Sequence, residues 1–96
     1  MAEHELKCWP EPFEAICNDT KTAEYRRDDR GFLVGDVLVL REWDPNMRSL
    51  ADGQRGEYTG LEIHKTVTHI ARGPDWGIPK GFVVLSLRPD GRVRRY

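Results

Sequence analysis

Four consecutive apolar side chains, from Val37 to Leu40, lie between a Gly-Asp pair and a charged stretch. Side chains of a strand alternate between its two faces, so this run is apolar on both. Such a strand is buried on both faces and is central in a sheet or barrel. Residues 41–44 continue it to the rim. Gly35 and Asp36 shape its tight entry, Gly by allowing a positive φ and Asp by accepting hydrogen bonds from backbone amides. We assign both a structural role.

A strand and a helix are expected before this central strand. Residues 4–9 alternate so that Leu6 and Cys8 share one face, which predicts a first strand. Pro10 and Pro12 suit the first turn of a helix, where an amide has no intrahelical partner. The spacing of the following apolar residues predicts a short helix that packs on the sheet through Phe13, Ile16 and Cys17.

Three further strands are predicted, at residues 20–27, 58–72 and 82–87, the second with a bend or bulge at Gly60. Residues 45–57 are polar and contain Gly and Pro, which indicates a loop. The loop is either a lid over a ligand or a plain hairpin connection. This order of elements predicts an α+β fold, a small mixed β-barrel of about five strands with one short helix after the first strand.

Length and charge restrict the function. The 96 residues suit a single domain, and the net charge is −1, from 15 basic and 16 acidic residues. No overall positive field would attract nucleic acid, so any contact with phosphate must come from a local patch. The two cysteines lack the spacing of a redox or zinc pair. Neither a signal peptide nor an apolar run of about twenty residues is found. We therefore expect a cytoplasmic protein, of its own cell or of a host cell, with no membrane contact.

The stretch from Lys21 to Arg30 is densely charged. If it is extended, Thr22, Glu24 and Arg26 line one face, and Ala23 and Tyr25 line the other. The apolar face would then contact the core. The polar face either meets water or lines a cleft in which its groups are aimed at a ligand, and the pattern leaves both interpretations open.

A longer ordered series includes this stretch: Leu6, Lys7, Phe13, Ile16, Lys21, Thr22, Glu24, Arg26, Gly35 and Asp36. This series resembles the ASCH family of the PUA-like superfamily, and most closely its small uncharacterised members from bacteria and phages. The resemblance runs from about His4 to Leu87 and implies a PUA-like barrel. It also implies a pocket for RNA or a modified nucleotide at Lys21, Thr22, Glu24 and Arg26.

The residue types in this pocket suit a nucleotide ligand. Lys7 joins the cluster if the first two strands pair, which gives two or three cations beside one carboxylate. Arg and Lys bind phosphate, and Glu accepts hydrogen bonds from the exocyclic amines of bases. We therefore predict a binding module for RNA or a nucleotide. Three tryptophans are either core residues or a stacking rim of this pocket: Trp9, Trp43 and Trp76.

Two other functions stay open. Some ASCH proteins resemble amidohydrolases of acylated cytidine, and Lys21 matches their lysine, but Glu24 occupies the position of their threonine. We therefore expect binding without turnover, with a hydrolase of modified nucleosides as the alternative. A protein-interaction module acting through residues 45–57 is a further alternative. No cofactor is expected, and no metal either, because the spacing of the histidines is not that of metal ligands: His4, His64 and His69.

Overall fold

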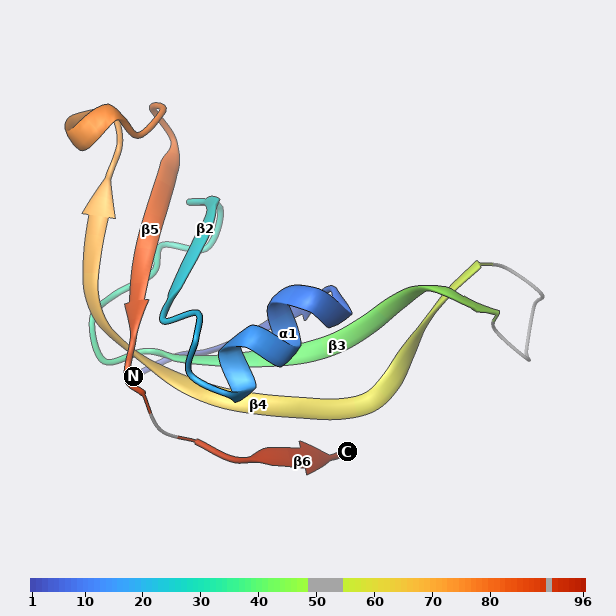
Figure 1. Ribbon diagram of the computed structural model, residues 1–96. Coiled ribbons are helices and arrows are strands. Elements are labelled where there is room, and N and C mark those ends of the chain that lie inside the picture. The colour runs from blue at the N-terminus through green and yellow to red at the C-terminus, as the bar shows by residue number, and fades with distance from the viewer. Residues whose placement is uncertain (49–54, 90) are drawn as a thin grey trace.

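The computed structural model describes residues 1–48, 55–89 and 91–96 (Figure 1). Most of the predicted elements are present, with bounds shifted by a few residues. In chain order the elements are β1 (Glu3–Cys8), α1 (Pro10–Cys17), β2 (Ala23–Arg27), β3 (Val37–Arg48), β4 (Arg55–Arg72), the 3₁₀ turn η1 (Asp75–Gly77), β5 (Phe82–Leu87) and β6 (Val93–Arg95).

The described strands form one mixed, open sheet of six strands, in the order β1-β3-β4-β5-β2 with β6 also beside β4. β1 runs parallel to β3, and the other pairs are antiparallel. The predicted mixture of strand directions and the single short helix after β1 are confirmed. The predicted closed barrel of about five strands is wrong, because β1 and β2 end the order of the sheet and do not pair with each other.

The curvature of the sheet comes from β4, whose two halves pair with different strands. Its residues 61–63 pair with β6, and its residues 67–72 pair with β5 (Figure 1). The predicted irregularity at Gly60 is confirmed. Gly60 has a φ of 91° and lies where the register with β3 shifts. Arg41 of β3 faces Glu62 of β4, whereas Trp43, only two residues further along β3, faces Tyr58. β4 therefore carries the extra residues of a bulge.

Helix α1 covers the inner face of the sheet (Figure 1). Pro10 is its first residue, and its side chains Phe13 and Ile16 are buried, as their spacing predicts. Burial of each contributes about 1.5–3 kcal/mol. The described core residues form one cluster: Leu6, Cys8, Phe13, Ile16, Phe32, Leu38, Leu40, Ile63, Val67, Val83, Leu85 and Leu87.

Lys65 is the one charged side chain in the row that β4 sends into the core between Ile63 and Val67. It is 2% exposed, and its Nζ lies 3.0 Å from Oδ1 of Asp19. Asp19 follows α1 with a φ of 61°, a conformation that Asp tolerates better than most residues. The buried cation therefore attaches the exit of the helix to the centre of the sheet.

The entry to β3 has the structure predicted for it. Gly35 has a φ of 95°, and Asp36 is buried. The Asp36 carboxylate accepts hydrogen bonds from the backbone amides of Ala2, at 3.1 Å, and Leu33, at 3.0 Å, and it pairs with His4 Nε2 at 2.8 Å. These bonds attach the start of β1 to the start of β3.

The predicted loop over residues 45–57 is wrong at both ends. β3 continues to Arg48 and β4 begins at Arg55, so residues 45–48 and 55–57 extend the two strands as an arm that leads away from the helix (Figure 1). Residues 49–54 lie outside the described residues. The hypothesis that residues 45–57 form a lid depends on this segment, so it also lies outside the described residues. The facing aromatic side chains of Trp43 and Tyr58 favour strand pairing in this otherwise polar stretch.

Candidate functional site

The two faces of β2 are opposite to the prediction. Glu24 is 8% exposed and points inward, whereas Tyr25 is 54% exposed and points outward. The expectation that Tyr25 packs in the core is therefore wrong. Tyr25 stacks on Phe82 of the neighbouring strand β5, with ring centroids 5.4 Å apart and an interplanar angle of 16°. Ala23 is half-buried.

The buried carboxylate of Glu24 is held between two cations. Lys21 Nζ lies 3.0 Å from one carboxylate oxygen, and Arg26 Nε lies 3.2 Å from the other. Lys21 Nζ also donates to the backbone carbonyl of Ala23. A carboxylate placed this way carries no unpaired buried charge. The structure thus brings together three of the predicted site residues: Lys21, Glu24 and Arg26.

Arg26 also crosses the open side of the sheet. Its Nη2 donates to the backbone carbonyl of Lys7 on β1, at 3.0 Å. The pairing of β1 with β2 that would bring Lys7 into the cluster is not formed, because β1 pairs with β3 and β2 with β5. We call this gap between the edges of β1 and β2 the seam. Lys7 contributes its carbonyl to the seam, while its ammonium lies over the ring of Trp43, 4.2 Å from the centroid.

Thr22 does not join the polar cluster through β2, which begins one residue later. The residue is exposed, and its backbone carbonyl accepts a hydrogen bond from Leu87 N at 2.9 Å. Its described role is thus to attach the start of β2 to the end of β5.

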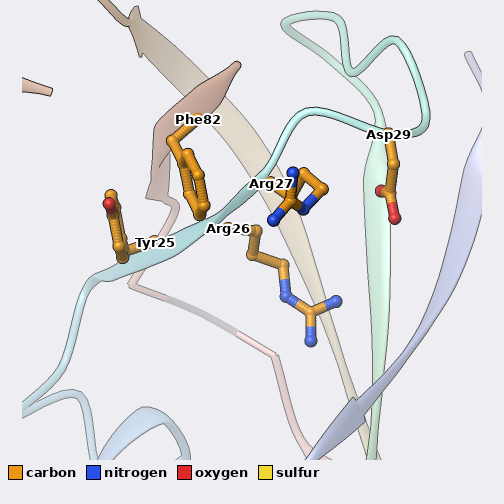
Figure 2. A pocket seen from close by; sticks show the side chains of 5 residues that line it. All are labelled: Tyr25, Arg26, Arg27, Asp29 and Phe82. Atoms are coloured by element: carbon orange, nitrogen blue, oxygen red, sulfur yellow. The ribbon is translucent and has the colours of Figure 1, made fainter. Parts of the chain in front are cut away.

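An open pocket of about 380 Å³ lies beside the cluster. Figure 2 shows its lining: the stacked Tyr25 and Phe82 on one side, Asp29 on the other, and two arginines between. The guanidinium of Arg27 lies over the ring of Phe82, with Cζ 5.0 Å from the centroid. The lining residues are Tyr25, Arg26, Arg27, Asp29 and Phe82.

The chain that follows β2 is fixed beside the pocket by Arg72. Its guanidinium pairs with the carboxylate of Asp28 and donates to the carbonyl of Phe32, at 2.6 Å. Asp28 N in turn donates to the carbonyl of Gly81, at 2.8 Å, just before Phe82. These bonds hold both sides of the pocket to the sheet.

The three tryptophans do not form one rim. Trp9 and Trp43 lie together, with ring centroids 6.2 Å apart, near the start of α1. Trp76 lies in η1 on the connection from β4 to β5, far from that helix end (Figure 1). None of them is buried, so the interpretation of the three as core residues is wrong.

A nucleophilic cysteine is not supported at this site. Burial, and then the charge of Glu24, raise the pKa of the Cys8 thiol to about 12, so it stays protonated near neutral pH. Both cysteines are free thiols, and Cys17 is half-buried at the end of α1. Within residues 1–48, 55–89 and 91–96, no group of three or more His, Cys, Asp or Glu side chains could hold a metal ion.

A third buried carboxylate, Glu62, lies on the outer face and escapes prediction from the sequence. Arg41 Nε lies 3.3 Å from it, and His64 Nε2 is hydrogen bonded to it. Burial raises the pKa of this carboxyl, but the bonds from His64 and Arg41 outweigh burial and lower it. Arg41 also pairs with Glu5 at 3.0 Å and lies over the ring of Tyr96. This group joins β1, β3, β4 and the last residue.

The pocket residues Tyr25, Arg27, Asp29 and Phe82 are not among the predicted site residues. A different assignment of faces to β2 would have found the first two, because Tyr25 and Arg27 alternate with Glu24 and Arg26. Phe82 carries no such signal, since the first residue of an apolar strand is normally a core residue.

Comparison with known proteins assigns the chain to a family. Residues 3–87 match the model of a domain of unknown function, DUF3850. The chain belongs to the DUF3850 family. It is also 30% identical, over 73 residues, to an "Uncharacterized 12.9 kDa protein in GpA 3'region" of Escherichia phage P2. The match covers 76% of this chain and 58% of the length of that relative. The described helices include none that is both long and apolar enough to span a membrane.

Proposed function

We propose that this DUF3850 protein binds RNA or a nucleotide, including modified nucleotides, at the pocket beside the Lys21–Glu24–Arg26 cluster. One observation carries the proposal: two adjacent arginines and a stacked Tyr25–Phe82 pair line the same open pocket. The arginines match the charge and geometry of a phosphate, and the outer face of Tyr25 offers a surface for a base.

The cluster behind the pocket supports this function by positioning Arg26. Its guanidinium has two anchors, the Glu24 carboxylate at 3.2 Å and the Lys7 carbonyl at 3.0 Å. A guanidinium has five donors in a fixed fork, so these two bonds leave others for a phosphate. The resemblance of the chain to the ASCH family of PUA-like proteins supports the same kind of ligand.

The contacts of Lys21 favour binding over hydrolysis. Its ammonium is held by the Glu24 carboxylate and by the carbonyl of Ala23. An amine with two acceptors is poorly placed to activate water or substrate. Glu24, which occupies the position of the threonine of the hydrolytic ASCH relatives, is in turn held by Lys21 and Arg26.

The test is a titration of the purified protein with the four common ribonucleoside monophosphates and a short single-stranded RNA, by isothermal titration calorimetry. Arg27→Ala is the informative variant, because Arg27 is exposed and contacts only the Phe82 ring among the described interactions. Loss of one charge-assisted bond to phosphate should weaken binding about tenfold or more. Arg48→Ala, at an exposed arginine on the hairpin arm, is the matched control and should bind normally.

Two results would contradict the proposal. Unchanged affinity in Arg27→Ala, with a native thermal transition, would remove the pocket from the binding surface. Release of product from acylated cytidines, followed by chromatography and abolished in Lys21→Ala, would make the protein a hydrolase instead.

A further inference from the structure

Trp9 and Trp43 form an aromatic pair outside the pocket. Trp9 lies between β1 and α1 and is 56% exposed, and its ring is tilted 43° from that of Trp43. Lys7 Nζ lies over the Trp43 ring at 4.2 Å from the centroid. The Trp43 ring packs closely against the backbone of Gly56, because a Cβ added to Gly56 would lie 2.0 Å from Trp43 Cζ2. The backbone of β4 therefore limits the movement of the Trp43 ring on that side.

The fold does not explain why an aromatic side chain stands at position 9. The residue caps α1 through its backbone, since its carbonyl accepts a hydrogen bond from Phe13 N at 2.9 Å, and its side chain makes no capping bond. A small polar residue would serve that position better. A tryptophan more than half exposed also forgoes most of the stabilisation that burial gives.

The aromatic pair is connected to the pocket through the seam. Arg26 lines the pocket and donates to the carbonyl of Lys7, and Lys7 is two residues from Trp9. Arg26 thus links the pocket to the end of β1, the strand that leads to Trp9. The pocket, the cluster behind it and the seam contain four cations, Lys7, Lys21, Arg26 and Arg27, and two carboxylates, the buried Glu24 and the exposed Asp29.

We propose that the Trp9–Trp43 pair is a second base-binding subsite, so that the ligand of this surface is single-stranded nucleic acid and not a mononucleotide. One base stacks on Tyr25 and a neighbouring base on Trp9. The phosphates between them contact Arg26 and Lys7. The inference rests on the proposed function of the pocket and extends it across the seam. Alternation of aromatic rings and cations is the arrangement that binds single strands with little sequence preference.

The experiment compares uridine monophosphate with an oligouridylate of about eight nucleotides, a length within the range of such sites, by isothermal titration calorimetry. The wild-type protein should bind the oligonucleotide at least about tenfold more tightly, because a second base adds its own stacking. Trp9→Ala should lose this advantage and keep its affinity for the monophosphate. Trp76→Ala, at a tryptophan that is 85% exposed in η1, should match the wild type with both ligands.

A second variant tests the same subsite if Trp9→Ala does not fold. Lys7→Gln removes the charge, keeps a polar side chain and leaves both tryptophans in place. It should weaken binding of the oligonucleotide only. An oligothymidylate of the same length distinguishes DNA from RNA as the ligand. Equal affinity for the two oligonucleotides would mean that the surface binds single-stranded nucleic acid in general, and weaker binding of oligothymidylate would mean that it prefers RNA.

The outcomes distinguish this inference from the proposed function. Equal affinity of the wild type for monophosphate and oligonucleotide would overturn the second subsite and leave the pocket intact. Unchanged oligonucleotide binding in both Trp9→Ala and Lys7→Gln would do the same. Failure of the wild type to bind either ligand would overturn both proposals.

Discussion

Two inward carboxylates, Glu24 and Asp36, have different surroundings that give them different roles. Asp36 accepts bonds from two backbone amides and His4, so it fixes the chain where β1 and β3 begin. Glu24 is held by side-chain cations, and the side chain of Lys21 is 35% exposed. A carboxylate bonded mainly to the backbone stabilises the fold. One held by accessible cations can instead position them for a ligand.

Acid should weaken the fold through Asp36. Its hydrogen bonds, first that from His4, lower the pKa of the carboxyl from 3.8 to about 2. Above the unfolded value both states are ionised and the stabilisation is complete. As the pH falls below 3.8 the unfolded chain takes up the proton first, so the stabilisation is lost progressively down to about pH 2. Thermal unfolding followed by circular dichroism should show Asp36→Asn less stable near neutral pH, with the deficit shrinking across this window.

Asp29→Asn is the control for that measurement, since Asp29 is an exposed carboxylate whose described ion pair with Arg30 is long, at 3.8 Å. It should follow the wild type at every pH. A deficit of Asp36→Asn that stays constant from neutral to acid pH would assign its effect to packing and not to the carboxylate charge.

At the scale of elements, the hairpin arm has the aromatic pair at its base. Gly56 has a φ of 95° and contacts the Trp43 ring, whereas Gly60, with a φ of 91°, has open space around it. The two glycines share the backbone conformation and differ in the neighbour that a new methyl group would meet.

Gly56→Ala should therefore be the more damaging of two otherwise matched substitutions. A positive φ costs an alanine about 1–2 kcal/mol at either position. At Gly56 the methyl group must also displace the Trp43 ring, which adds about 1–3 kcal/mol. Urea unfolding of both variants gives the difference directly. Equal free energies of unfolding for Gly56→Ala and Gly60→Ala would mean that the Trp43 ring moves without cost.

The elements differ in how well their sequences predict them. The entry at Gly35–Asp36 and the buried face of α1 are predictable because they depend on neighbouring residues only. β2 is not, because Tyr25 is the one large apolar side chain between Ala23 and Arg27, and it suggests a core face. Phe82 on β5 provides an outer partner for Tyr25, while Lys21 and Arg26 allow Glu24 to be buried. These contacts depend on strand pairing, which alternation alone does not give.

At the scale of the whole molecule, the seam distinguishes this open sheet from the barrel that the order of elements predicts. The parallel pairing of β1 with β3 and the bend of β4 place β1 and β2 at the two ends of the order. In a closed barrel, backbone hydrogen bonds would join β1 to β2. Here the side chain of Arg26 on β2 joins the two strands by its bond to the Lys7 carbonyl on β1. The seam therefore presents cations at an edge that no described strand covers.

A net charge of −1 and a local patch of cations predict that binding depends only weakly on salt. With two or three phosphates contacted, by Arg26, Arg27 and Lys7, affinity for a single strand should fall about sevenfold to twentyfold between about 50 and 200 mM salt. Calorimetric titrations at several salt concentrations measure this slope. A much steeper loss would indicate a wide basic surface including the C-terminal strand. Replacing Arg92, Arg94 and Arg95 by Gln removes the charges of this end without shortening the chain and should leave the slope unchanged. A shallower slope in that variant would mean that β6, and not the seam, makes the phosphate contacts.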